Sequence, residues 1–100
     1  MNKIMVELFS ASHCSRCVKA KEQVQALVAK INKENDTVEL IYREVDIVEN
    51  IEYCVQLGVI GTPSIAINSV LAFNQIPSLA ALTVAITSAS LPSEHCKGSL

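Results

Sequence analysis

The organisation of this chain is decided by residues 4–17, which read IMVELFSASHCSRC. Residues 4–9 form a short and almost continuous apolar run, which is typical of a strand buried in the centre of a sheet. Small polar residues interrupt it, and apolar side chains then recur at helical spacing from Val24 to Ile31. We therefore expect a strand over 4–9 and a helix over 15–32, with Cys14 and Cys17 at their junction.

The middle of the chain predicts a second strand and a second helix. Residues 37–45 are rich in β-branched and aromatic side chains and favour a strand. A helix is expected over 47–57, with Asp46 as its N-cap, Glu49 as the capping-box partner, and Gly58 ending it. The apolar face of this helix is expected to contain the residues Ile47, Ile51, Cys54 and Val55.

The last part of the chain predicts a hairpin and a helix. Strands are expected over 64–67 and 70–73, joined by a two-residue turn at Asn68 and Ser69. Pro77 and Ser78 open a helix that runs to residue 88. The order β-α-β-α-β-β-α requires parallel crossovers followed by an antiparallel pair, so the fold class is α/β with a mixed four-stranded sheet flanked by helices.

Length and composition limit the classes of protein to consider. One hundred residues, half of them hydrophobic, suit a single globular domain, here expected over 1–88 with a flexible tail over 89–100. The net charge is −2 without a basic run, so no nucleic-acid partner is expected. No apolar segment approaches the roughly 20 residues of a membrane helix, and no signal-peptide core precedes Glu7. We expect a cytoplasmic protein without a membrane partner.

The spacing of Cys14 and Cys17 suits thiol chemistry. The thiolate is the form that attacks a disulfide, and a helix N-terminus stabilises a thiolate through its free N–H groups and dipole. Arg16 adds positive charge beside Cys14, and a protonated His13 would add more. A separation of three places Cys17 one helical turn behind Cys14, where the two can form a disulfide. Cys14 is the expected nucleophile and Cys17 the expected resolving cysteine.

Metal binding is the alternative for such a pair. A closed zinc site needs two further ligands, and the remaining candidates are His13, Cys54, His95 and Cys96. Neither of these two cysteines has a neighbouring cysteine, so no metal and no cofactor are expected. A binding module that uses the pair for a soft metal such as Cu(I), or for redox sensing, stays open as the alternative function. Cys54 is expected to be a small buried hydrophobe.

The second motif is Gly61-Thr62-Pro63-Ser64, which follows the second helix and opens the third strand. Together with the upstream cysteine pair it resembles the thioredoxin superfamily over residues 3–88, and the short chain is similar to the minimal glutaredoxin-like core. The resemblance implies a thioredoxin fold and a thiol–disulfide oxidoreductase. It also implies that Pro63 is cis, beside the cysteine pair, and that Thr62 offers its backbone to an extended substrate.

Three departures from the family pattern affect the expected partners. The dipeptide between the cysteines is Ser15-Arg16, not the Gly-Pro of thioredoxins or the Pro-Tyr of glutaredoxins. Leu8 stands where thioredoxins carry a buried acid, and Glu7 beside it points to the opposite face of the sheet. Residues 73–78 lack the Gly and Asp with which glutaredoxins hold glutathione. A disulfide-containing protein substrate and an external reductase or thiol reductant are therefore the expected partners, and glutathione stays open.

The last helix is apolar on more than one face, with Leu79, Leu82 and Ile86 among its residues. Such a helix is buried on two sides or meets a partner. We expect a monomer, with a homodimer as the alternative.

Overall fold

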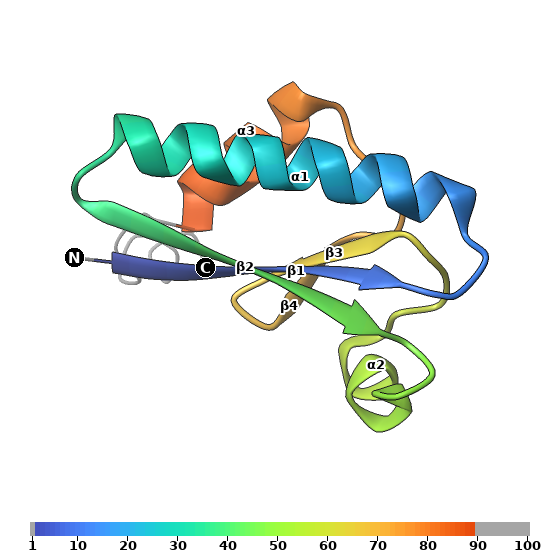
Figure 1. The fold of residues 1–100 in the computed structure, drawn as a ribbon. Coiled ribbons are helices and arrows are strands. Elements are labelled where there is room, and N and C mark those ends of the chain that lie inside the picture. Colours follow the sequence, from blue (N-terminus) through green and yellow to red (C-terminus); the bar gives the residue numbers. More distant parts are fainter. Residues whose placement is uncertain (1, 90–100) are drawn as a thin grey trace.

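The computed structural model describes residues 2–89, which form one sheet and three helices (Figure 1). The elements, in chain order, are β1 (Asn2–Ser10), α1 (Ser15–Glu34), β2 (Val38–Asp46), α2 (Ile51–Leu57), β3 (Ser64–Ile67), β4 (Val70–Phe73) and α3 (Leu79–Ala89). The predicted order and fold class are confirmed. Of the tail expected over 89–100, residues 90–100 lie outside the described residues, and residue 89 is the last residue of α3.

The sheet has the order β2-β1-β3-β4, so β1 lies in its interior. β1 pairs in parallel with β2 and antiparallel with β3, and in this register Leu8 lies opposite both Glu44 and Ile65. The apolar run in β1 is explained by this position, since Ile4, Val6 and Leu8 are all buried. The mixed sheet predicted from the element order is confirmed.

Helices cover both faces of the sheet. α1 and α3 lie together on one face, and α2 lies on the other (Figure 1). On the α1 side, Val24, Leu27 and Val28 pack against β1, as their helical spacing predicts. On the α2 side a smaller cluster forms around Phe9 and Cys54. Because Cys54 is only 3% exposed, its predicted role as a buried hydrophobe is confirmed.

The hairpin between β3 and β4 has the predicted bounds. Its two turn residues, Asn68 and Ser69, have φ angles of 52° and 64°. Positive φ at both central residues is the geometry of the turn that matches strand twist in two-residue hairpins. Asn68 also accepts a hydrogen bond from the backbone N–H of Met5 through its Oδ1 atom, at 2.9 Å, which ties the turn to β1.

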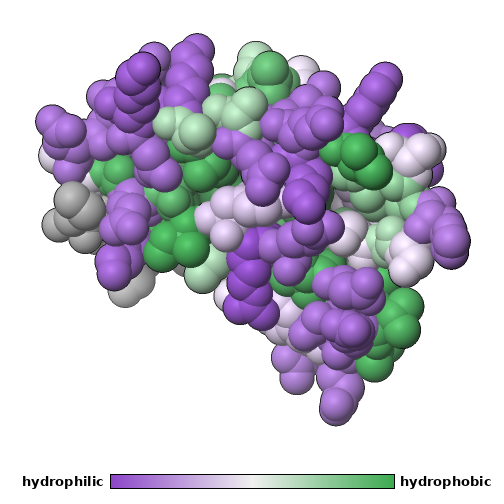
Figure 2. Space-filling model, in the orientation of Figure 1, coloured by the Kyte–Doolittle hydropathy of each residue, from purple (hydrophilic) through white to green (hydrophobic). Residues whose placement is uncertain are grey.

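The prediction for the second helix is wrong at its start and for two of the four residues assigned to its apolar face. Asp46 Oδ1 accepts hydrogen bonds from the N–H groups of Val48 and Glu49, but these residues form a turn, and α2 begins only at Ile51. Ile51 and Val55 are 60% and 71% exposed. Ile47 and Cys54 contribute to the buried cluster under α2, as predicted, whereas Ile51 and Val55 face solvent. In Figure 2 the lower-right part of the molecule is mainly hydrophilic, with a hydrophobic patch along its right edge.

In α3 the buried side is formed by Leu82 and Ile86, while Leu79 and Val84 are more than half exposed. The helix therefore buries one face and leaves apolar side chains on another. Within residues 2–89, no helix combines the length and the apolar character needed to cross a membrane.

A buried carboxylate lies on the α2 side of the sheet. Glu7 is 2% exposed, and its Oε1 accepts a hydrogen bond from the hydroxyl of Tyr53 on α2. Its Oε2 lies 3.7 Å from Nε of Arg43, which is half-exposed. Burial, followed by the hydrogen bond to Glu7, raises the pKa of Tyr53.

The hydroxyl of Tyr42, on the other face of the sheet, is buried without a hydrogen-bond partner in residues 2–89. Burial, and secondly the charge of Glu44, raise the pKa of Tyr42 to about 12.

These two tyrosines provide a matched test of the packing. Tyr53→Phe removes a donor from a buried carboxylate, which should lower the free energy of unfolding by about 1–3 kcal/mol at neutral pH. Tyr42→Phe removes a hydroxyl that satisfies nothing, so the free energy of unfolding should stay the same or rise. Urea unfolding of both variants measures the difference. Equal destabilisation of the two variants would contradict the hydrogen bond as a support of α2.

Candidate active site

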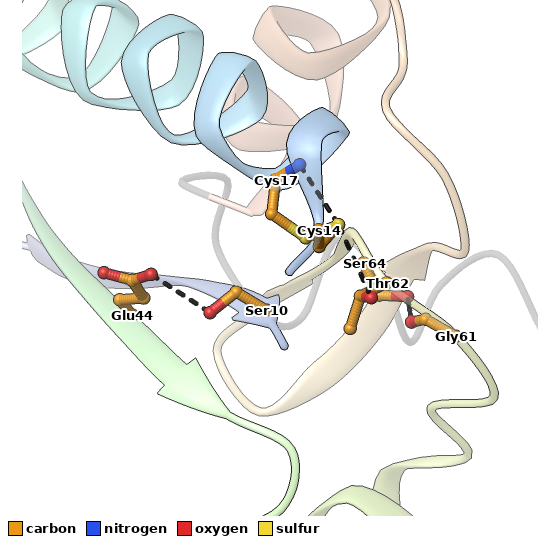
Figure 3. Close-up of a disulfide and its surroundings, with 7 residues drawn as sticks. All are labelled: Ser10, Cys14, Cys17, Glu44, Gly61, Thr62 and Ser64. Atoms are coloured by element: carbon orange, nitrogen blue, oxygen red, sulfur yellow. Dashed lines mark hydrogen bonds between the residues drawn. A yellow bond between two sulfur atoms is a disulfide. The ribbon is translucent and has the colours of Figure 1, made fainter. Parts of the chain in front are cut away.

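Cys14 lies where the chain passes from β1 into α1. It is the N-cap residue of α1, with extended backbone angles, and its Sγ atom accepts the backbone N–H of Cys17 at 3.2 Å. The two cysteines form a disulfide with their Cα atoms 5.3 Å apart (Figure 3). The same N–H group also donates to the backbone carbonyl of Cys14 at 3.2 Å. The N-cap position therefore places the sulfur of Cys14 at the positive end of the helix dipole, within reach of a helix N–H group.

The two sulfurs differ in their access to solvent. Cys14 is partly exposed, whereas Cys17 is 5% exposed and packs under the first turn of α1. Cys14 is therefore the more accessible of the two cysteines. The spacing of the two residues alone does not fix this difference in exposure.

The loop before β3 lies against the disulfide. The peptide bond between Thr62 and Pro63 is cis, and the Thr62 hydroxyl donates to Cys14 Sγ at 3.8 Å. In Figure 3 the Thr62 side chain points toward Cys14. The fully buried Ser64 donates through its hydroxyl to the carbonyl of Gly61 at 2.6 Å, which closes the loop on itself. The motif at 61–64 is thus brought to the cysteine pair from nearly fifty residues away in sequence.

A cavity of about 560 Å³ opens on one side of the pair and is lined by His13, Cys14 and Cys17. Its lining also includes Ser10, Lys21 and Glu44, three polar residues that the sequence analysis did not single out. Ser10 donates to Glu44 Oε2 at 3.0 Å, and Lys21 Nζ lies 3.1 Å from Glu44 Oε1. The spacing of Lys21, four residues after Cys17 on the same helix, was an available signal. Glu44 has no such signal, because only the register between β1 and β2 brings it there.

A second cavity, of about 540 Å³, is lined by Arg16 together with Thr62 and Pro63. The six residues singled out from the sequence are therefore all at one end of the molecule. Arg16 and the loop residues border one cavity, while the exposed His13, which has a φ of 62°, borders the other.

Two other candidates lie away from this site. Glu7 faces α2, as strand alternation predicts, and the carboxylate in the cavity with the cysteines is that of Glu44. Cys54 is in the cluster under α2, where burial, and secondly the charges of Asp46 and Glu7, raise the pKa of its thiol.

No group of three His, Cys, Asp or Glu side chains within residues 2–89 has a metal-binding arrangement. His95 and Cys96 lie outside the described residues.

A cysteine pair at the start of a helix, facing a cis-proline loop on a mixed four-stranded sheet, is the arrangement of a thiol–disulfide oxidoreductase. Residues 2–86 match the family model described as "Thioredoxin domain". The chain belongs to this family.

Known proteins agree with the assignment. A protein described as "Thioredoxin" from Methanocaldococcus jannaschii is 33% identical over 86 residues, which are 86% of this chain and 95% of that protein. The solved structure of thioredoxin 1 from Thermosipho africanus superposes with a TM-score of 0.62 at 19% identity, over 85% of this chain and 92% of its own. Thioredoxin f2 from Chlamydomonas reinhardtii gives 0.62 at 19% identity, over 92% and 83%. These two structures support the fold.

The contact between Thr62 and Cys14 can be tested in the reduced protein. Thr62→Val keeps the shape of the side chain and removes the donor, so the thiolate of Cys14 loses a stabilising hydrogen bond. The pKa of Cys14 should therefore rise, measured from thiolate absorbance against pH. Thr83→Val is the control, because its hydroxyl donates to the Leu79 carbonyl on α3. An unchanged pKa in Thr62→Val would show that the hydroxyl does not act on the thiolate.

Proposed function

We propose that this protein is a dithiol reductase of disulfide-bonded proteins, with Cys14 as nucleophile and Cys17 as resolving cysteine. The observation that carries the proposal is the difference between the two sulfurs. Cys14 is accessible and lies at the N-cap of α1, where its thiolate is favoured, whereas Cys17 is buried behind it. A reductase needs this order, because the first attack is on an external disulfide and the second is internal.

The proposed reaction has two displacements. The Cys14 thiolate attacks one sulfur of the substrate disulfide, and the first substrate thiolate leaves and takes up a proton. Cys17 then loses its proton and attacks the Cys14 sulfur, which releases the second substrate thiolate. Two electrons have moved from the cysteine pair to the substrate, and the protein is left with the Cys14–Cys17 disulfide. An external reductase or thiol reductant must restore the dithiol.

Substrate contacts are proposed for four further residues. Thr62 and Pro63 form a wall beside Cys14, and an extended substrate segment is proposed to pair with the backbone at Thr62. Arg16 and His13 border the two cavities that flank the disulfide, where the substrate chain on either side of its cysteine would lie.

The proposed setting is the cytoplasm, where thiol reductants regenerate such a pair, and the proposed active form is the monomer. The displacements described above need one cysteine pair per chain and no second subunit. Glutathione is an open partner in this proposal, either as the reductant or as one half of a mixed disulfide.

Single cysteine variants test the mechanism. Cys14→Ser should abolish disulfide reduction, because the buried Cys17 cannot reach an external disulfide. Cys17→Ser should still attack but should accumulate a mixed disulfide with substrate on Cys14, visible as an added mass. Both are measured with a reduced protein and a protein disulfide substrate, and Cys54→Ala is the control that should keep activity.

The same measurements distinguish the proposed reductase from the alternative, a binding module. Full activity in Cys14→Ser would contradict the assignment of the nucleophile. If the wild-type protein reduced no disulfide but bound Cu(I) or zinc through the pair, the binding-module alternative would replace the proposed function.

A further inference from the structure

The cavity between Arg16 and the cis-proline loop is adjacent to Cys14, the attacking residue of the proposed reaction, through Thr62. Thr62 lines this cavity of about 540 Å³, and its hydroxyl is 3.8 Å from Cys14 Sγ. A group attached a few bonds from a substrate sulfur would therefore enter the cavity while that sulfur meets Cys14. The residues that line the cavity therefore influence the selectivity for substrates.

Arg16 is the one charged residue among those that line the cavity, and the other walls are apolar or carry amide and hydroxyl groups, such as Asn74, Gln75 and Thr62. Its side chain is exposed, and the two ion pairs within residues 2–89, Lys21–Glu44 and Arg43–Glu7, do not include it. The cavity thus presents a guanidinium group without a carboxylate partner from the described part of the chain.

The cavity on the other side of the disulfide has a different charge pattern. There Lys21 is already paired with Glu44, and the carboxylate of Glu44 would repel another anion. An acidic group next to a substrate disulfide therefore has a favourable place on the Arg16 side and not on the Glu44 side. A guanidinium group binds a carboxylate through two parallel N–H donors, which gives direction as well as attraction.

We propose that Arg16 makes this protein selective for disulfides that carry a carboxylate close to the reacting sulfur. The inference rests on the proposed function and adds the chemical class of the substrate. The carboxylate can come from an acidic residue beside the substrate cysteine or from a small organic acid disulfide. In either case it binds the Arg16 guanidinium while the neighbouring sulfur is attacked by Cys14.

The test uses three small disulfides of similar size: dithiodipropionate, which is anionic, bis(hydroxyethyl) disulfide, which is neutral, and cystamine, which is cationic. Reduced protein is mixed with an excess of each, and the rate at which the Cys14–Cys17 disulfide forms is measured. No external reductant is needed, because each protein molecule reduces one disulfide. Differences in intrinsic reactivity among the three cancel when wild type and variant are compared.

Arg16→Gln should lower the ratio of the anionic to the neutral rate about tenfold, which corresponds to about 1.4 kcal/mol. The ratio of the cationic to the neutral rate should rise. Any general effect of Arg16 on the Cys14 thiolate changes all three rates together and leaves the ratios unchanged. High salt should reduce the preference of the wild type, since the contact is exposed to solvent.

Lys19→Gln is the matched control. It removes the same charge from the first turns of α1, but Lys19 does not line the cavity, so the ratios should stay close to those of wild type. A pair of peptide disulfides with Asp or Asn beside the cysteine distinguishes the sources. A preference for Asp that is lost in Arg16→Gln assigns the site to acidic protein segments, and a preference confined to dithiodipropionate assigns it to small acids.

Unchanged ratios in Arg16→Gln, or an equal loss in Lys19→Gln, would overturn the inference while leaving the reductase function in place. A wild-type protein that reduces none of the three disulfides and neither peptide would overturn the proposed function, and the inference with it.

Discussion

The site depends on one hydrogen bond, from the backbone N–H of Cys17 to the Sγ atom of Cys14, at the point where β1 becomes α1. This hydrogen bond forms because the interior strand β1 ends at one edge of the sheet and α1 begins directly after it. The helix N-terminus favours negative charge on Cys14, and the helical turn that follows buries Cys17 behind it. The chemical difference between two identical side chains thus comes from backbone geometry.

Other parts of the structure hold the junction between β1 and α1 in place and position the residues around it. Val24 and Leu27 hold α1 to the sheet on one face, and the hairpin of β3 and β4 extends the sheet from β1. The loop before β3 carries Thr62 to the sulfur of Cys14. The opposite face has its own buried carboxylate, Glu7, which is satisfied by Tyr53 and is separated from the cysteines by the sheet.

The sequence predicted those elements whose structure depends mainly on residues that are close together in the chain. The apolar run of β1, the helical spacing in α1 and the turn at Asn68 each depend on neighbours in sequence, and all were predicted. Sequence reasoning failed for α2, where Asp46 caps a short turn rather than the helix, because the two structures use the same capping signal. The ion pair of Lys21 with Glu44 was missed because it depends on strand register, which no local pattern encodes. Arg16 was noticed for its position between the cysteines, but its cavity became visible only with the loop from 60 to 63 in place.

The central claim is that Cys14 and Cys17 form a reversible two-electron couple that acts as a reductant. The most direct measurement is a redox titration of the protein, read by thiol alkylation and mass, with peptide mapping to separate this pair from Cys54 and Cys96. The account predicts a Cys14–Cys17 disulfide that forms and breaks reversibly on the reducing side of the scale, where a potential near about −270 mV marks a reductant of thioredoxin type. A potential near about −120 mV would mark an oxidant, and the absence of any Cys14–Cys17 disulfide would contradict the account altogether.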